Sequence, residues 1–394
     1  MTKKMIMAWM GILLLAGCTQ SEEAGMEPGS LDAVPIRFDC SPQEGLVRGD
    51  FLSAKSAKSA KSAAATRAAN GTTGFTTSEN GHLLYSGFGV FAREEGATAF
   101  DFMSNQKVEY TFLTNSIYDG YWSYSPLKYW PHHYDSGAGK NIPTTLQFCA
   151  YAPYVEHPET PLPAGTKGIL DVSAANATTP TIFYARANRL EDAVDLLWCY
   201  LESNTAETAT LQMSHALARL GVSITLTSKA TNIQKVLVER ITLTGTIASQ
   251  GKLDLTSHTE VTEDGETRRI PSWTVAPEDK VATTIVIDHT PSADSYGIIA
   301  ESVRYVEGLP ESWQPAGLQV GTTVNALTQD DDQPTHLLLI PQESLTLTAH
   351  LVLHIYYSDS TPEATIRRTG SAVEIANPLR GNTPYNLNLQ IALP

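Results

Sequence analysis

The sequence is poor in positive charge. Its 27 Lys and Arg residues stand against 42 Asp and Glu residues, so that the formal net charge of the 394 residues is −15 at pH 7. A surface that binds nucleic acid needs clustered Lys and Arg side chains. The densest basic group here is only Lys55, Lys58 and Lys61, within a polar run. The charge balance therefore argues against a nucleic-acid partner and suits a protein that stays soluble outside the cell.

Cysteine is also scarce, with four residues in the whole chain. Beyond Cys18 they are Cys40, Cys149 and Cys199, and their spacing fits neither a disulfide framework nor a metal-binding motif. Cys149 and Cys199 lie within apolar runs, which is typical of small buried side chains. We expect no redox function from these thiols.

The motifs of the common hydrolases and metalloenzymes are absent. The sequence contains no G-x-S-x-G and no H-E-x-x-H. Gly87 to Ala92 matches the loose dinucleotide pattern G-x-G-x-x-A, but these residues continue as a strand rather than a helix. Ser214 and His215 are neighbours that point to opposite faces of a strand, so we interpret His215 as a buried, hydrogen-bonded histidine. The sequence thus predicts neither an enzyme nor a bound cofactor or metal.

A long apolar run occurs at the start of the chain. Met5 to Gly17 follows Lys3 and Lys4 and is too short for a transmembrane helix, which needs about 20 residues. The run closes with Leu15-Ala16-Gly17-Cys18, which resembles the bacterial lipobox, so residues 1–17 are predicted to be a lipoprotein signal peptide and Cys18 the lipidated residue. An ordinary signal peptide or a chance cysteine is the alternative. Ser21-Glu22-Glu23 resembles the acidic tag of surface lipoproteins in Bacteroidales, which predicts exposure on the cell outer membrane.

The segment from residue 18 to 67 is predicted to be a leader with one strand and a flexible tether. Val34, Ile36, Phe38 and Cys40 share one face of an extended stretch, 34–40, and Pro35 suits a strand edge or start. Three Ala-Lys-Ser units then follow at 54–62, and such a run has almost nothing to bury. Arg48 and Arg67 lie in or beside this tether. A strand that fills a core but is joined to the rest of the chain by a segment open to proteolysis suggests that this strand is cut away.

The same alternation returns at the end of the chain. The apolar face there consists of Tyr385, Leu387, Leu389, Ile391 and Leu393. If cleavage released the leader strand, this strand of another copy could fill the vacated groove by strand addition. The simpler interpretation is that each segment is an edge strand of its own domain, because alternating strands occur in every sheet.

From Leu83 onward, short apolar stretches separated by Gly, Pro, Asn and Asp predict β-strands, and long helical periodicity is absent. His215 to Leu220 is a stretch in which one helical turn is expected. The spacing predicts an all-β protein with two consecutive β-sandwich domains, residues 68–205, completed by the leader strand, and residues 206–394. The predicted strands are Leu83–Ala92, Val108–Leu113, Leu146–Tyr151, Thr181–Tyr184, Val194–Tyr200, Thr210–Ser214, Val222–Thr227, Val236–Leu243, Val281–Ile287, His336–Ile340 and Leu345–Tyr356.

An aromatic cluster is the best candidate for a ligand-binding surface, since exposed rings can stack on sugars. It consists of Trp122, Tyr124, Tyr129, Trp130 and Tyr134. Trp122 and Tyr124 share one strand face, however, and this favours packing in the core.

A series of short motifs also marks the chain. They are Thr66-Arg67-Ala68, Gly89-Val90-Phe91-Ala92, Phe102 to Val108, Trp122 to Pro131, Ala150 to Tyr154, Asp195 to Trp198, Ser214 to Leu220 and Leu338 to Gln342. In this order they resemble the fimbrillin-like (type V pilin) proteins of Bacteroidales over nearly the whole chain. The resemblance implies transthyretin-like β-sandwich domains in an exported lipoprotein. It also implies removal of the leader by an arginine-specific protease, and polymerisation by donor-strand exchange.

The resemblance points to Arg67 as the processed residue, through Thr66-Arg67-Ala68, with Arg48 as the competing site. We therefore predict a structural or adhesive subunit of cell-surface fimbriae. Its partners would be other fimbrial subunits, the outer membrane through the lipid on Cys18 before processing, and host or bacterial surface ligands. The alternative is a non-polymerising surface lipoprotein of the outer membrane that binds glycans or host ligands.

Overall fold

A computed structural model describes much of the chain. The described residues are 34–42, 87–113, 120–158, 162–163, 165–203, 208–228, 232–263, 266–290, 299–306, 316–318, 323–325, 328–329, 333–334, 336–358 and 364–393. The predicted signal peptide, Cys18, Arg48, Arg67 and the Ala-Lys-Ser tether lie outside these residues. Within the described ranges, no helix has the length and apolar character needed to cross a membrane.

The regular structure described is β-strand, apart from the short 3-10 helices η3 (Leu190–Asp192) and η4 (Pro277–Asp279), so the predicted all-β class is confirmed. The first sheet has seven strands, in the order β1 (Arg37–Pro42), β11 (Thr208–His215), β10 (Leu197–Ser203), β7 (Leu146–Ala152), β2 (Phe88–Glu94), β3 (Met103–Phe112) and β4 (Gly120–Ser123). A four-stranded sheet follows the order β15 (Glu266–Thr274), β14 (Gln250–Glu263), β9 (Thr181–Ala185) and β8 (Gly168–Val172).

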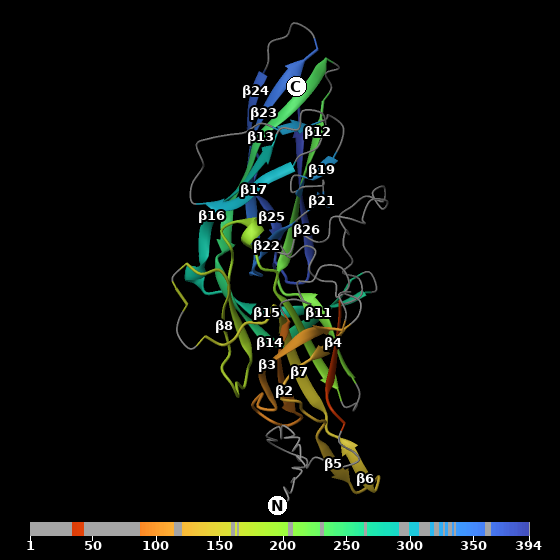
Figure 1. Ribbon diagram of the computed structural model, residues 1–394. Helices are drawn as coiled ribbons and strands as arrows, with labels where there is room; N and C mark the ends of the chain where they lie inside the picture. The colour runs from red at the N-terminus through yellow and green to blue at the C-terminus, as the bar shows by residue number, and fades with distance from the viewer. Residues whose placement is uncertain are drawn as a thin grey trace, which may run out of the picture.

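The remaining strands form two larger sheets and two small pairs. One sheet contains β19 (Thr323–Asn325), β12 (Ala218–Thr227), β22 (Leu337–Leu339) and β26 (Pro384–Ala392). The other contains β17 (Ile299–Val306), β16 (Lys280–Thr290), β13 (Ile233–Ala248), β23 (Leu345–Tyr357), β24 (Ala364–Thr369), β18 (Ala316–Leu318) and β25 (Val373–Ala376). The pairs are β5 (His132–Asp135) with β6 (Lys140–Pro143), and β20 (Thr328–Gln329) with β21 (Gln333–Pro334). The molecule is elongated, with β2, β3 and β7 toward one end and β13, β23 and β24 toward the other (Figure 1).

Strand pairing crosses the domain boundary that the sequence suggests at residue 205. β11 begins beyond that boundary, yet it pairs with β10 through Leu197–His215 and Trp198–Ser214. β14 likewise pairs with β9, which precedes the boundary. The polar run near 205 therefore connects paired strands of one sheet, and the division into two domains stays a prediction.

The helical turn expected over His215 to Leu220 is wrong. His215 ends β11 and Ala218 begins β12, and the two residues between them form a bend. The amide of Ala216 donates to the carbonyl of Leu196 at 2.7 Å, and the amide of Asn382 donates to the carbonyl of Leu217 at 3.2 Å. Contacts from distant parts of the chain thus hold this bend, and local propensity does not decide it.

The central strands of the first sheet are buried on both faces. Along β7, Phe148 and Ala150 point into a core that also contains β1, whereas Cys149 and Tyr151 point into a second core. The second core continues through the rest of the molecule to Leu393. The first sheet therefore serves as the shared wall of two apolar layers, in keeping with the alternation of its strands.

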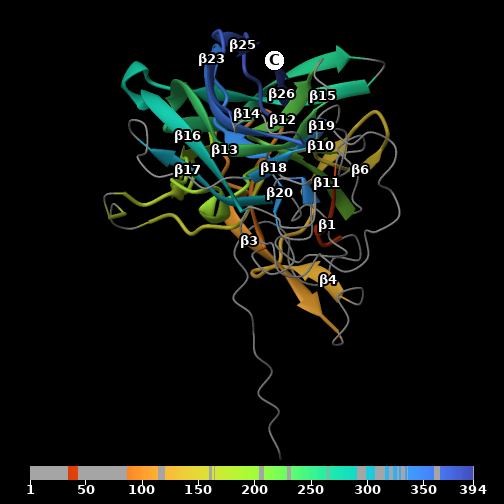
Figure 2. The same ribbon diagram turned by 90° about the horizontal axis from the view of Figure 1, so that it is seen from above.

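Two strand pairs are parallel, and the other described pairs are antiparallel. β1 runs parallel to β11, and β26 runs parallel to β12. β11 and β12 are consecutive strands joined at Ala216–Leu217. Seen from above, β1 lies beside β11 at one side of the stack (Figure 2). The segments nearest the two ends of the described chain thus attach in the same manner to neighbouring strands.

Candidate functional site

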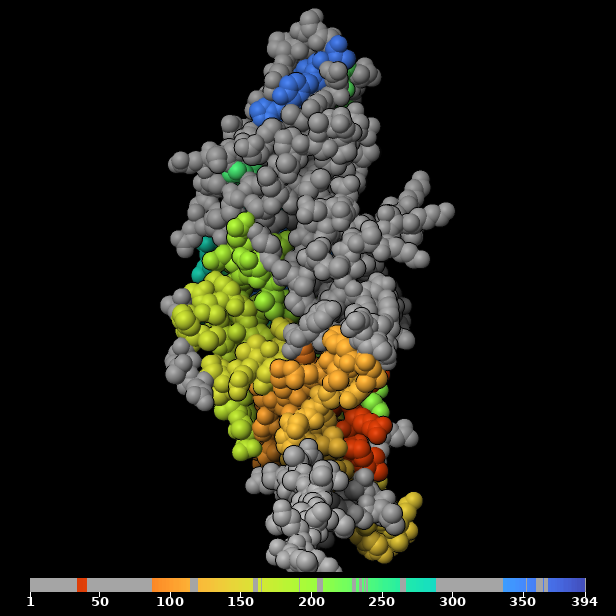
Figure 3. Space-filling view, viewed as in Figure 1, coloured from red at the N-terminus to blue at the C-terminus, as the bar shows by residue number. Residues whose placement is uncertain are grey.

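The candidate site is the groove that holds β1 at the edge of the first sheet. β1 pairs with β11 from Arg37–Thr208 through Pro42–Met213. Ile36, Phe38 and Cys40 are at most 5% exposed, whereas Arg37 and Asp39 face solvent. Val34 is half-buried against the same core. Figure 3 shows residues 34–40, in red, at the surface, so the strand is open along one side although its apolar face is buried.

The segment changes its hydrogen-bonding partner between Ile36 and Arg37. Before this point, the amide of Ile36 donates to the carbonyl of Lys128, and the amide of Trp130 donates to the carbonyl of Val34, both at 2.9 Å. After it, the strand follows β11. The segment therefore joins the edge of β11 to residues 128–130, which follow β4 in the chain.

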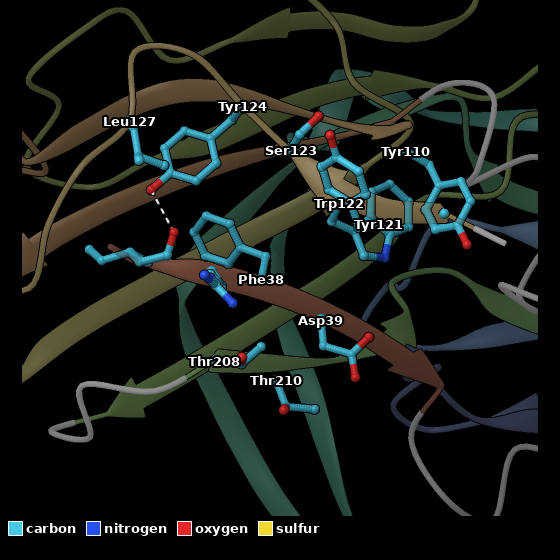
Figure 4. A pocket seen from close by; sticks show the side chains of 13 residues that line it. Phe38, Asp39, Tyr110, Tyr121, Trp122, Ser123, Tyr124, Leu127, Thr208 and Thr210 are labelled. Atoms are coloured by element: carbon cyan, nitrogen blue, oxygen red, sulfur yellow. Dashed lines mark hydrogen bonds between the residues drawn. The ribbon is translucent and has the colours of Figure 1, made fainter. Parts of the chain in front are cut away.

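The side chain of Tyr124 binds the segment at Ile36, where its hydrogen-bonding partner changes. Its hydroxyl donates to the carbonyl of Ile36 at 2.9 Å, drawn as the dashed line in Figure 4, and accepts from the amide of Lys128 at 3.3 Å. Burial raises the pKa of Tyr124 well above its ordinary value, so the phenol stays protonated and can donate. Because the acceptor is a backbone carbonyl, this contact does not depend on the side chain that the strand carries at that position.

Phe38 occupies the centre of the apolar contact. Its ring lies 6.2 Å from Phe88 and 5.8 Å from Phe148 between centroids, both edge to face, and 5.4 Å from Tyr124. Edge-to-face aromatic pairs add about 0.5–1.5 kcal/mol to the effect of burial. Ile36 is fully buried beside it. Phe38 of β1 and Ile36 directly before it thus anchor one face of the segment in the core.

A cavity of about 870 Å³ lies between β1 and β4. Figure 4 shows Tyr110, Tyr121 and Trp122 at one side of it and Tyr124 with Leu127 at the other. Its polar lining comes from Arg37, Asp39, Ser123, Thr208 and Thr210. The cavity therefore has aromatic walls and a rim of hydroxyl and charged groups.

The aromatic cluster predicted from the sequence is divided between core and surface. Trp130 is fully buried, and Trp122 packs between Phe88 at 4.9 Å and Tyr110 at 5.1 Å. Tyr129 and Tyr134 are exposed, the latter by 66%. The two tryptophans therefore pack in or against the core, and the exposed tyrosines are accessible to a ligand.

The C-terminal segment forms the last strand of its own sheet. β26 pairs with β12 from Pro384–Arg219 through Ala392–Thr227. Leu387, Ile391 and Leu393 are buried, while Tyr385 and Leu389 are half-buried against the same core. A groove of about 620 Å³ runs along β26 toward β23 and β25. The strand is therefore integrated in the fold and would have to leave β12 to serve another molecule.

Cys40, Cys149 and Cys199 are free and buried. Burial raises the pKa of Cys199 to about 12, and it raises the pKa of the other two thiols well above the ordinary value. Such thiols stay protonated and unreactive at neutral pH. Among the described residues, no group of three or more His, Cys, Asp or Glu side chains is placed to hold a metal ion.

A buried contact between a histidine and a carboxylate lies where β10 and β11 meet. Nδ1 of His215 is 2.6 Å from Oδ2 of Asp195, and both side chains are about 95% buried. The sequence predicts a buried, hydrogen-bonded His215 but does not identify its partner. The one sequence feature that could have indicated this partner is that both residues belong to the short motifs described above, Asp195-Leu196-Leu197-Trp198 and Ser214-His215. Likewise, nothing in the sequence pattern marks the contact of Tyr124 with Ile36.

Comparison with known proteins identifies the family. The model of the family described as "Fimbrillin-like" matches residues 66–301. The fimbrium subunit Fim1C of Phocaeicola vulgatus is 26% identical over 239 residues, which are 56% of this chain and 50% of that protein, so the chain matches about half the length of this curated relative. A fimbrial protein from Bacteroides vulgatus aligns with a TM-score of 0.42 and 18% identity, over 78% of this chain and 89% of that one. Because the family model spans more than half of the sequence, this protein belongs to the fimbrillin-like family.

Proposed function

We propose that this protein is a subunit of cell-surface fimbriae whose first strand occupies the assembly groove until it is removed. The family is one of structural fimbrial subunits rather than enzymes, in agreement with the expectation from the sequence. The precursor is exported as a lipoprotein and anchored through Cys18 in the outer membrane. Cleavage after Arg67 or Arg48 then separates the leader from the body of the protein.

The observation that carries this proposal is the burial of Ile36 and Phe38 on a strand at the very edge of the sheet. Burying these two side chains stabilises the fold by about 3–6 kcal/mol in total. The whole stability of a domain is only about 5–15 kcal/mol. A protein that loses β1 therefore exposes an apolar groove that needs a new occupant.

Cleavage changes how strongly the leader competes for this groove. While it is covalently joined, the leader rebinds at a high effective concentration and excludes other strands. Both Arg48 and Arg67 lie beyond Pro42, so a cut at either residue leaves β1 held by noncovalent contacts alone. The intact leader also covers an edge that would otherwise invite aggregation.

The replacement strand is β26 of another copy or of a related fimbrial subunit. Support comes from its parallel pairing with β12, which is the pairing mode of β1 with β11. Its apolar face has the same period of two. Other fimbrial subunits are thus the main partners in the proposed assembly.

The test is to treat purified precursor with an arginine-specific protease and to analyse the product on a gel without boiling. We expect ladders of multimers and a new amino terminus at Ala68 or Gly49. Variants Arg67→Ala and Arg48→Ala, separately and together, identify the bond and provide the uncleaved control. Complete cleavage that leaves only monomers would contradict the proposal.

A second candidate function is supported by the cavity beside β1. Tyr121 is 52% exposed and Tyr129 43%, and Tyr121 lines the cavity together with Asp39 and Ser123. Such a combination suits a glycan-binding lipoprotein that keeps its leader and does not polymerise. Amino-terminal sequencing of the surface form separates the two functions, because this second one requires lipidated Cys18 on all copies.

A further inference from the structure

We propose that the C-terminal strand of the incoming subunit enters the groove in one register, with Tyr385 in the place of Ile36 and Pro384 in the place of Pro35. This inference rests on the proposed function and adds the alignment of the two strands. It is drawn from the residues of β1 and β26 and from the backbone contacts that now hold β1.

The two segments have the same order of residue types and a similar order of exposure. Pro35 and Pro384 are both half-buried and stand directly before the first apolar residue of the strand. An exposed polar residue then alternates with an apolar residue, which is buried in β1 and at Leu387 and half-buried at Tyr385 and Leu389. The matched pairs are Pro35 with Pro384, Ile36 with Tyr385, Arg37 with Asn386, Phe38 with Leu387, Asp39 with Asn388, and Cys40 with Leu389.

The direction of the strands also agrees. Since β1 runs parallel to β11, a replacement that keeps proline at its leading end must run parallel to β11 as well. β26 already pairs in parallel with β12. The strand can therefore exchange one parallel partner for another without changing the faces on which its side chains lie.

The backbone contacts of Tyr124 and Lys128 are compatible with this register. The Tyr124 hydroxyl donates to the carbonyl of Ile36, and the amide of Ile36 donates to the carbonyl of Lys128, each at 2.9 Å. In the proposed register both contacts pass to Tyr385, which has the same backbone groups. Pro384 precedes it and needs no amide partner, as Pro35 needs none now.

The proposed register places apolar residues of the incoming strand along β11 beyond the part that the described residues of β1 cover. β1 pairs with β11 as far as Met213, although β11 continues to His215. With Tyr385 at the position of Ile36, Ile391 lies opposite Met213 and Leu393 opposite His215. In this register the strand pairs along the full length of β11.

There is room for a larger side chain at the position of Ile36. Tyr385 exceeds Ile36 in size, and the cavity of about 870 Å³ is lined by both Ile36 and Phe38. A slip by one residue would turn Asn386 and Asn388 into the core, which is strongly unfavourable. A slip by two residues would keep the faces, but it would place Asn386 at the position of Pro35 and Gln390 opposite Thr210.

Cross-linking between separate subunits tests the register. Thr210 faces Asp39 in the precursor and is exposed, so in the proposed assembly it faces Asn388. One preparation carries Thr210→Cys and a second carries Asn386→Cys, Asn388→Cys or Gln390→Cys. Each pair is mixed, treated with the arginine-specific protease and then with a short bis-maleimide. Protein without introduced cysteines gives the background from the buried native thiols.

We expect Thr210→Cys to give several-fold more cross-linked dimer with Asn388→Cys than with Asn386→Cys or Gln390→Cys. The dimer should form only after cleavage. Unboiled gels confirm that each variant still forms multimers. If multimers form but the cross-linked dimer is most abundant with Gln390→Cys, or equally abundant with all three positions, the register is wrong and strand exchange still stands. Cleaved protein that forms no multimers overturns the register and the proposed function together.

Discussion

The hydroxyl of Tyr124 donates a hydrogen bond to the backbone carbonyl of Ile36 across 2.9 Å, and the two residues lie 88 positions apart in the chain. This contact ties the first strand to the segment that follows β4. The strand segment 34–42 is thereby held by residues 124–130 at its beginning and by β11 thereafter.

Replacing Tyr124 with Phe should destabilise the precursor. The change removes the donor to the buried carbonyl of Ile36, and an unsatisfied buried acceptor costs about 1–3 kcal/mol. Chemical denaturation of the precursor measures the loss. Tyr121→Phe is the matched control, because Tyr121 is 52% exposed and should change stability very little. Equal stability of the two variants would show that the hydroxyl of Tyr124 contributes nothing.

Replacing Phe38 with Ala should have a larger effect. The ring is 5% exposed and contacts Phe88, Phe148 and Tyr124, so its removal should lower the free energy of unfolding by about 3–5 kcal/mol. Arg37→Ala on the exposed face of the same strand is the control, with an expected change within about 0.5 kcal/mol. If both variants unfold at the same denaturant concentration, β1 is not part of the cooperative core.

Gly381→Ala should disturb the bend between β11 and β12. A Cβ atom at Gly381 would clash with the backbone carbonyl of Ala216 and lie 2.9 Å from Pro271. Because that carbonyl also accepts a hydrogen bond from the indole of Trp273 at 2.9 Å, it cannot move freely, and a cost of about 1–3 kcal/mol is expected.

Gly370→Ala is the control for that clash. The nearest atom to a Cβ at Gly370 is 3.6 Å away, which is ordinary contact distance. Thermal unfolding of both variants decides between them. A Gly381→Ala protein as stable as the Gly370→Ala protein would contradict a tightly held bend.

Acidification should weaken the fold through His336. Burial, together with the nearby charges of Arg219 and His215, lowers its pKa from 6.5 to about 4. The unfolded chain therefore takes up a proton below pH 6.5 while the folded protein does not, so this contribution to stability is complete above pH 6.5 and is lost as the pH falls toward 4. The loss at pH 4 is about 3 kcal/mol.

The contribution of His336 is measured as a difference between two proteins. His336→Gln lacks the titrating group, so its stability should fall less than that of the unaltered protein between pH 7 and pH 4. Denaturation curves across this range give the two slopes. Parallel pH dependence of both proteins would assign the acid sensitivity to other groups.

The amino-acid order alone predicts the faces of many strands. The alternation over 34–40 and 385–393 is a local property, because successive side chains of an extended backbone point to opposite sides. The buried positions of β1 and β26, namely Ile36, Phe38, Leu387 and Ile391, follow from that alternation. The family could be recognised for a related reason, since its short motifs are contiguous in the chain.

Only the tertiary structure decides which strands pair and where the sheets end. β11 joins the first sheet although a polar run precedes it, and the stretch after His215 bends rather than forming a helical turn because Leu196 and Asn382 bind its backbone. The partner of Tyr124 and the pairing of Asp195 with His215 are equally invisible in the sequence. The alternation of residue types shows which side of a strand is apolar. Strand pairing, in contrast, depends on contacts between residues far apart in the chain, such as Phe38 and Ala209. These contacts form only when the whole core is packed.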